Sequence, residues 1–172
     1  SYGGGADGDY PPPPATRLRD GAFGLLRHLE SLGPQAVILD ALVASSMRDT
    51  PFPETDDVRG DFRTHLRSVI EVFNGETGRL VAAMLAEGQS DRDGAVQFRE
   101  RFWQPRREIS LARLRRGIEL GQIRSDIDAE SVLDAIYGPV WLRLMVGHLP
   151  LAIEDADAIV DSLWPGIASK SS

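Results

Sequence analysis

The sequence predicts an all-α domain. Its 172 residues include 42% hydrophobic side chains, which is enough for one globular domain with a buried core. After the first residues, apolar side chains recur three and four positions apart, and no segment alternates with a period of two. Glycine, proline and asparagine interrupt this pattern where helices are expected to end.

Composition excludes several other classes of protein. No apolar run approaches the roughly 20 residues that a membrane-spanning helix needs. Cysteine is absent, which excludes disulfides, thiol catalysis and thiolate metal sites. There are 19 basic and 26 acidic residues and the net charge is −7, which is unusual for a chain that binds nucleic acid chiefly through a basic surface. Residues 1–14 lack the basic and apolar regions of a secretory signal, so we expect a cytoplasmic protein.

The first elements are delimited by glycine and proline. Residues 1–14, rich in both, predict a disordered tail. Residues 15–32 carry a helical stripe of leucine and alanine that stops at Gly33. A second helix is expected over residues 35–48, because the apolar pattern ends shortly before Pro51.

The third and fourth helices are predicted from their caps. Thr55 and the two aspartates after it offer a cap and an acidic first turn for a helix that ends at Asn74. Gly75 then separates this helix from a fourth over residues 76–87, which has its own apolar face.

The next two helices are expected to meet at a proline. Ser90 and Asp93 resemble a capping box that opens a fifth helix ending at Gln104. Pro105 suits the first position of a sixth helix, which ends at Gly121.

The last two helices differ in their apolar pattern. Residues 128–148 are apolar around more than one face, which predicts contacts on two sides. Gly138 and Pro139 lie in the middle of this helix and predict a kink. After Pro150, a final helix with one apolar face opens with acidic residues from Glu154 onward.

Several separate motifs resemble the C-terminal domain of the TetR/AcrR family of bacterial transcriptional regulators. They occur in the expected order: FRERFWQPRR at 98–107, RG at 116–117, GQIRSDID at 121–128 and YGPVWLR at 137–143. In addition, VILDAL at 37–42 resembles the helix that links the family's DNA-binding head to its ligand domain.

The resemblance implies an all-α TetR-like bundle with a dimerising C-terminal helix pair. It implies a ligand-responsive, DNA-binding transcriptional repressor, whose partners are a second copy of the chain, a small-molecule effector and operator DNA. The domains would be a disordered tail at 1–14, a remnant of the DNA-binding domain at 15–48, and a ligand-binding and dimerisation domain at 49–172.

The sequence departs from the family pattern near its start. Residues 20–33 look like the family's first helix, but the two helices that should follow, including the recognition helix, are missing before Pro34. Residues 1–33 hold three arginines and four acids, a net charge of −1, so the DNA-binding residues stay unknown. We expect that the natural protein has a segment that this sequence lacks. The alternative is a stand-alone helical ligand-binding or dimerisation module that does not bind DNA.

Large side chains on the expected helices give the candidate sites. The ligand-pocket candidates are Phe73, Met84, Phe98, Phe102, Tyr137, Trp141 and Met145, with Arg143 beside them. The dimer-interface candidates are Val132, Ile136, Val140, Ile159, Leu163 and Trp164. For each pocket candidate, a place in the core is the simpler alternative.

The sequence holds no pattern typical of an enzyme. His28, His65 and His148 are scattered and lack the spacing of metal ligands. No serine elbow or phosphate-binding loop is present, so we expect no catalytic residue, no cofactor and no metal.

Arginine is concentrated between residues 99 and 124, where eight arginines and three acids give a local charge of +5. The simpler interpretation is a solvated face that pairs with acidic neighbours, and the alternative is an anionic-ligand or nucleic-acid surface. Arg106 and Arg107 oppose the dipole at a predicted helix start. We therefore expect one of them to have a specific carboxylate or ligand partner.

Overall fold

The computed structural model describes residues 37–88 and 91–169. The predicted tail at 1–14, the predicted helix at 15–32 and the predicted Ser90 cap lie outside these residues. The chain divides into two compact units, Ser1–Ile38 and Leu39–Ser172, and the fold described below is that of the second unit.

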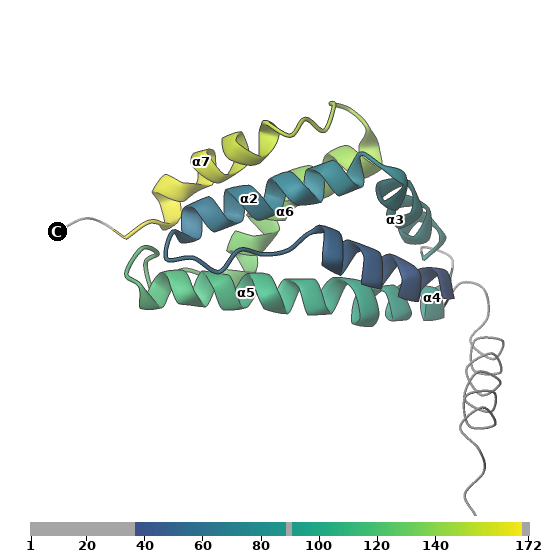
Figure 1. The fold of residues 1–172 in the computed structure, drawn as a ribbon, viewed down its shortest axis with the longest axis horizontal. Helices are drawn as coiled ribbons and strands as arrows, with labels where there is room; N and C mark the ends of the chain where they lie inside the picture. Colours follow the sequence, from purple (N-terminus) through teal and green to yellow (C-terminus); the bar gives the residue numbers. More distant parts are fainter. Residues whose placement is uncertain (1–36, 89–90, 170–172) are drawn as a thin grey trace, which may run out of the picture. The chain divides into compact units, whose positions relative to one another are not determined.

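The second unit is a bundle of helices (Figure 1). The backbone is helical up to residue 49, and the elements that follow are α2 (Val58–Phe73), α3 (Glu76–Glu87), α4 (Arg92–Phe98), the π-helical segment η1 (Arg99–Trp103), α5 (Gln104–Glu119), α6 (Ala129–Val146) and α7 (Asp155–Ile167). Within the described residues, the β-type pairing is an isolated bridge between Ile123 and Ala168. The predicted all-α class is confirmed.

Helix α2 lies at the centre of the bundle. It runs beside α7 on one side, and it also packs against α3, α5 and α6 (Figure 1). Val58, Phe62, Leu66 and Ile70, four residues apart, are each 0% exposed. This spacing places all four on one face of α2, so that face forms the middle of the hydrophobic core.

Three helices begin at an aspartate whose side chain caps the backbone. Asp57 accepts a hydrogen bond from the Gly60 N–H (3.0 Å), and Asp128 accepts one from the Ser131 N–H (2.7 Å). Asp91 caps α4 by accepting from the Asp93 N–H (3.1 Å). The cap of α4 is therefore Asp91 and not the predicted Ser90. An aspartate at this position satisfies an N–H group that has no partner within the helix.

Pro105 lies in the first turn of α5, as predicted, but the chain does not leave the helical conformation before it. The helical backbone continues from Arg92 to Glu119, because five π-helical residues, Arg99–Trp103, join α4 to α5. Proline lacks an N–H, and in a regular α-helix its ring would clash with the carbonyl four residues earlier. The wider π turn, in which the Gln104 N–H bonds the Arg99 carbonyl, accommodates this proline within the helix.

Helix α6 passes through a proline and ends at a glycine. Pro139 lies inside the helix, preceded by Gly138. Because glycine has no Cβ to meet the proline ring, the helical conformation is tolerated just before Pro139. Gly147, with φ +65°, caps the C-terminus in the left-handed conformation. The helix therefore ends two residues before the predicted His148.

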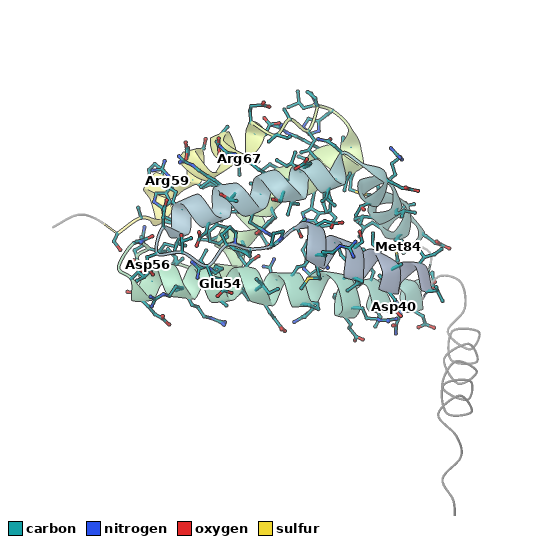
Figure 2. The ribbon with its side chains drawn as sticks, in the orientation of Figure 1. Asp40, Glu54, Asp56, Arg59, Arg67 and Met84 are labelled. Carbon is teal, nitrogen blue, oxygen red and sulfur yellow. The ribbon has the colours of Figure 1, made fainter. Side chains whose placement is uncertain are left out.

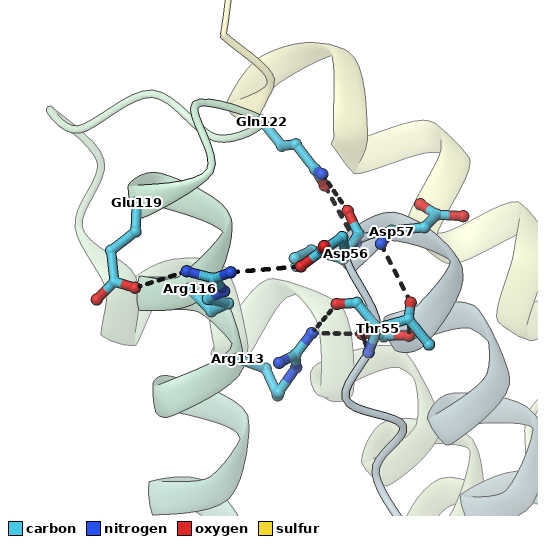
Figure 3. Close-up of polar contacts among 9 residues, drawn as sticks. Thr55, Asp56, Asp57, Arg113, Arg116, Glu119 and Gln122 are labelled. Carbon is cyan, nitrogen blue, oxygen red and sulfur yellow. Dashed lines mark hydrogen bonds and ion pairs between the residues drawn. The ribbon is translucent and has the colours of Figure 1, made fainter.

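A buried ion pair fixes the segment between residue 50 and α2 (Figure 3). The Asp61 carboxylate on α2 pairs with Arg113 of α5, and the two side chains are 3% and 10% exposed. Asp61 also accepts from the Thr55 N–H (2.9 Å) and hydroxyl (2.7 Å), and Arg113 donates to the Thr55 carbonyl (2.7 Å). Each buried charge therefore has an opposite charge and a polar partner, as burial requires, although Arg113 Nε is buried without a hydrogen-bond partner among the described residues.

The same segment has further polar contacts nearer the surface. Gln122 accepts from the Val58 N–H (3.1 Å) and donates to the Asp56 carbonyl, while Arg116 pairs with Asp56 (3.3 Å). Figure 3 shows these contacts converging on the turn before α2. Asp56 is 84% exposed, so its ion pair adds little to stability.

Charged side chains also link α2 to α7. Arg59 and Arg63 both pair with Asp161, and Arg67 pairs with Asp157; Figure 2 shows Arg59 and Arg67 between the two helices. The hydrogen bond from Arg63 lowers the pKa of the Asp161 carboxyl. These exposed pairs hold the register of two helices whose main attraction is apolar.

Candidate ligand-binding site

A cavity of about 230 Å³ lies among α2, α5, α6, the segment η1 and residues 46–50. Its lining residues are Ser46, Thr50, His65, Val69, Phe73, Phe102, Trp103, Arg106, Arg107, Ser110, Leu133, Asp134, Tyr137, Gly138 and Trp141. Most of this surface is apolar, with a few polar groups, which is typical of a small-molecule site.

Aromatic rings form one wall of the cavity. Trp141 of α6 packs against Phe73 of α2 with ring centroids 5.0 Å apart, and against Trp103 with centroids 4.9 Å apart. Phe102, from the same π turn as Trp103, is 1% exposed. Rings held by each other in this way form a rigid apolar surface against which a flat molecule can pack.

His65, which also lines the cavity, is a neutral imidazole whose orientation is fixed. Its Nδ1–H donates to the Pro51 carbonyl (3.3 Å), and its ring stacks on Phe52 with centroids 4.2 Å apart. Burial, together with the nearby Arg106 charge, lowers the pKa of His65 to about 4, although the hydrogen bond to Pro51 acts in the opposite direction. The ring is therefore uncharged at neutral pH, and its Nε2 is left as a hydrogen-bond acceptor.

Two hydroxyl groups of the lining satisfy each other. The Tyr137 hydroxyl lies 3.1 Å from Ser110 Oγ, and Ser110 in turn donates to the Arg106 carbonyl (3.2 Å). Burial raises the pKa of the Tyr137 hydroxyl, so it stays protonated. Tyr137 therefore serves as a neutral part of the wall.

The two adjacent arginines of α5 have different surroundings. Arg107 donates to Glu130 (2.6 Å) and pairs with Asp134 (2.7 Å), and these bonds raise its pKa despite the opposing effect of desolvation. Arg106 has no carboxylate partner among the described residues. It donates to the Phe102 carbonyl (2.8 Å) and the Val43 carbonyl (3.5 Å), and its guanidinium lies 3.9 Å from the centroid of the Phe102 ring.

The helix that ends at residue 49 and the next residue, Thr50, supply two further lining groups. Thr50 donates to the Ser46 carbonyl (2.6 Å), so its hydroxyl is satisfied. Ser46 is 1% exposed, and its hydroxyl has no hydrogen-bond partner within the described part of the chain. An unpaired buried hydroxyl beside a cavity is a group that a ligand can satisfy.

Four of the seven predicted pocket residues line this cavity: Phe73, Phe102, Tyr137 and Trp141. Met84 and Phe98 instead line a second cavity of about 230 Å³ beside α3 and α4. Met145 is 44% exposed and lines neither. Arg143 pairs with Asp155 and donates to the Pro150 carbonyl (3.2 Å), so it fixes the turn before α7.

The predicted interface residues fall into two groups. Ile136, Val140 and Trp164 are 1%, 0% and 9% exposed and belong to the core of the chain itself. The other three, Val132, Ile159 and Leu163, are half-buried and pack at the edge of that core. When a helix has apolar residues on two faces, the sequence does not show which face packs in the core and which is free to contact a partner.

Most of the polar lining could not be predicted from the sequence. Ser46, Thr50, His65, Ser110 and Asp134 carry no local pattern that distinguishes them from ordinary helical residues. The sequence drew attention to Arg106 and Arg107 because both were expected at a helix start, where they would oppose the dipole. In the structure helical backbone precedes them, so the dipole does not explain their partners. Arg107 has the expected carboxylate partners, whereas Arg106 has none in the described part of the chain.

The described residues hold no group of three or more histidine and carboxylate side chains that could bind a metal ion. Over the same residues, no helix is both long enough and apolar enough to cross a membrane.

Comparison with known protein families shows which family this chain belongs to. The family model "Tetracyclin repressor-like, C-terminal domain" matches residues 52–163. The chain belongs to the TetR family. The resemblance seen in the sequence motifs is thereby confirmed.

Two relatives of this TetR family member are similar over most of the described chain. "Uncharacterized HTH-type transcriptional regulator YdeS" of Bacillus subtilis (strain 168) is 32% identical over 111 residues, covering 64% of this chain and 56% of the relative. The chain thus spans little more than half the length of that regulator. The crystal structure of the TetR family transcription regulator SCO0332 superposes with a TM-score of 0.75 at 32% identity, covering 78% of this chain and 74% of that one.

Proposed function

We propose that this protein is a ligand-responsive transcriptional regulator that acts as a homodimer and represses its operator. Membership of the TetR family and similarity to two transcriptional regulators support the class. DNA binding, the effector and the dimer are parts of this proposal. In it, the region that matches the family model, residues 52–163, supplies most of the effector-binding and dimerising surface.

The observation that carries the proposal is the position of Ser46 and Thr50. Both line the cavity, and both belong to the stretch that continues the helical residues starting at 37. In the TetR resemblance, VILDAL at 37–42 corresponds to the helix that leads to the DNA-binding head. A ligand in the cavity would therefore touch the helix that carries the head.

This contact provides a route for regulation. A ligand changes an equilibrium only by binding one conformation more tightly than the other. A molecule between α5 and residues 46–50 has such a preference if those residues move when the head moves. The coupling must also be reciprocal, so operator DNA should weaken effector binding by the same factor.

We propose a dimer interface on the outward faces of α6 and α7, revised from the sequence prediction. Of the six most exposed large apolar side chains in the described residues, five gather at the end of α6 and in the following loop: Leu142, Met145, Val146, Leu149 and Ile153, which are 42–63% exposed. On α7, the exposed residues Ala158, Ser162 and Gly166 lie four apart and are small. Small side chains allow another helix to approach closely.

Light scattering tests this interface with two matched surface variants. The double variant Leu142→Glu/Val146→Glu should have the monomer mass of 18.8 kDa, whereas the wild type should have twice that mass. Leu80→Glu on α3, at a residue 38% exposed, should remain a dimer. A double variant that stays dimeric would exclude this surface. Trp164→Glu is unsuitable, because Trp164 packs in the chain's own core.

An electrophoretic mobility shift tests DNA binding. The natural protein should retard the DNA upstream of its own gene, and it should leave an unrelated fragment of equal length unshifted. The absence of any specific shift, with the dimer intact, would contradict regulation and favour the alternative of a stand-alone ligand-binding or dimerisation module.

A further inference from the structure

The charges that line the cavity do not cancel. Arg106 and Arg107 are opposed by one lining carboxylate, Asp134, while burial keeps His65 neutral by lowering its pKa. Asp134 pairs with Arg107. Glu130, the second partner of Arg107, is 58% exposed and does not line the cavity. The lining therefore carries one net positive charge, which lies on Arg106.

Arg106 is held in place without an anion. Its two hydrogen bonds to backbone carbonyls and its position over the Phe102 ring fix the guanidinium plane. A guanidinium has five N–H groups, so most of these donors have no acceptor in the described part of the chain. Burial lowers the Arg106 pKa to about 10, which still leaves the group charged at neutral pH. A partly desolvated cation of this kind gains stability when an anion binds.

Ser46 provides a second, independent sign of a missing partner. Its hydroxyl is buried, lines the same cavity and has no hydrogen-bond partner among the described residues. Both Arg106 and Ser46 belong to the lining of this cavity.

The rest of the cavity sets the shape and charge of the ligand. Phe73, Trp103 and Trp141 supply ring surfaces. The volume of about 230 Å³ exceeds the roughly 150 Å³ of a cavity that holds benzene, so one ring with a short side chain fits. A single guanidinium in apolar surroundings matches a singly charged anion better than a phosphate dianion, and its planar fork matches a carboxylate.

We infer that the effector of this cavity is a compact aromatic carboxylate, with Arg106 as its counter-ion and Ser46 as a second polar contact. The inference rests on the proposed function, because it names the ligand class of the proposed regulatory site. A bound carboxylate would accept from the free N–H groups of Arg106, and its ring would lie against the aromatic wall.

Binding measurements with matched probes test the inference. The probes are 3-phenylpropionate, the neutral 3-phenylpropionamide and the cationic 3-phenylpropylamine, each titrated by calorimetry into the full chain. We expect the carboxylate to bind at least about tenfold more tightly than the amide, because a charge-assisted hydrogen bond is roughly twice as strong as a neutral one. The amine should bind more weakly than the amide.

Variants assign the preference to one side chain. Arg106→Met keeps a long apolar stem, and it should reduce the carboxylate-to-amide ratio to about one, whereas Arg106→Lys should retain part of it. Arg115→Met, at an exposed arginine of the same helix, should leave the ratio unchanged. Ser46→Ala should weaken carboxylate binding severalfold. Circular dichroism of each variant confirms that it is folded.

Three results would overturn the inference. They are equal affinity of the wild type for carboxylate and amide, a tenfold preference that persists in Arg106→Met, or no binding of any probe at about 10 mM. Failure of the proposed function is distinguishable, because a protein that binds the carboxylate through Arg106 but shifts no DNA would keep this ligand class and lose the regulatory role.

Discussion

Helix α5 carries two arginines, two helical turns apart, that have different electrostatic partners. Arg113 is 10% exposed and meets the carboxylate of Asp61, which is 3% exposed. Arg106 is half-buried, and its guanidinium donates to two backbone carbonyls and lies over an aromatic ring. Seven residues separate the two, which places them on the same side of the helix.

This difference distinguishes an arginine that stabilises the fold, Arg113, from one that lines the candidate ligand site, Arg106. Burying a charge costs several kcal/mol unless an opposite charge and hydrogen bonds compensate. At Arg113 the chain supplies this compensation, and the contact fixes the segment that leads into α2. At Arg106 the chain supplies a cavity instead. His65, in the same cavity, avoids the cost of a buried charge in another way: its lowered pKa keeps the imidazole neutral.

The largest effect should come from removing the anion beside Arg113. In Asp61→Ala the buried guanidinium keeps its charge but loses its carboxylate partner. The free energy of unfolding, measured by urea denaturation, should fall by about 3–5 kcal/mol. Asp56→Ala, which removes the exposed partner of Arg116, should change it by less than about 0.5 kcal/mol.

Replacing the whole pair sharpens this result. Asp61→Leu/Arg113→Met removes both charges, so it should cost less than Asp61→Ala alone. A double variant less stable than the single one would show that the polar contacts to Thr55, and not the unpaired charge, dominate the loss.

The next effect concerns His65 and pH. Its pKa is about 4 in the folded chain and 6.5 as the ordinary value, so the unfolded chain binds more protons between these values. Stability should therefore be complete above pH 6.5 and fall as the pH is lowered toward 4. Between pH 7 and pH 5 the loss should be about 2 kcal/mol.

Two variants test whether His65 causes this pH dependence of stability. His65→Gln should abolish it, and His148→Gln, at an exposed position, should preserve it. Carboxylates with lowered pKa, such as Asp161, lose their contribution only below their ordinary value of 3.8, so they do not obscure this window. A slope that persists in His65→Gln would mean that another group titrates.

A smaller effect is expected from Arg106. Arg106→Met removes a poorly compensated charge but also two hydrogen bonds and a cation–π contact. In the absence of ligand, the free energy of unfolding should stay within about 1 kcal/mol of the wild type. A loss as large as that in Asp61→Ala would show that Arg106 is part of the scaffold.

The smallest effect is a shift in the titration of His65. The Arg106 charge is one of the causes that lower the His65 pKa. In Arg106→Met the pKa of His65 should therefore rise, as followed by the imidazole resonances in NMR. An unchanged pKa would mean that the two side chains do not sense each other across the cavity.

The sequence predicted most helices because their signals are local. Spacing places Phe62, Leu66 and Ile70 on one face, and Asp57 and Asp128 cap their helices without help from distant residues. Pro105 marked the start of α5 correctly. The π-helical residues that join α4 to α5 were missed, because such a turn leaves no mark in the apolar pattern.

The site was predicted less completely, because it depends on which faces meet. Phe73 and Trp141 were recognisable from their size, but Met145 has a similar size and is exposed. Trp164 looked available for a partner and instead packs in the core beside Arg59. The pairing of Asp61 with Arg113 joins residues 52 positions apart, so no local pattern announces it.

A crystal structure of the protein with 3-phenylpropionate would show whether Arg106 is the group that binds the anion. We expect a carboxylate within hydrogen-bond distance, about 3 Å, of the Arg106 guanidinium, with the ring against Trp141 and the Asp61–Arg113 pair undisturbed. A carboxylate bound to Arg107 or Arg113, or a ligand seated in the second cavity beside Met84, would contradict it.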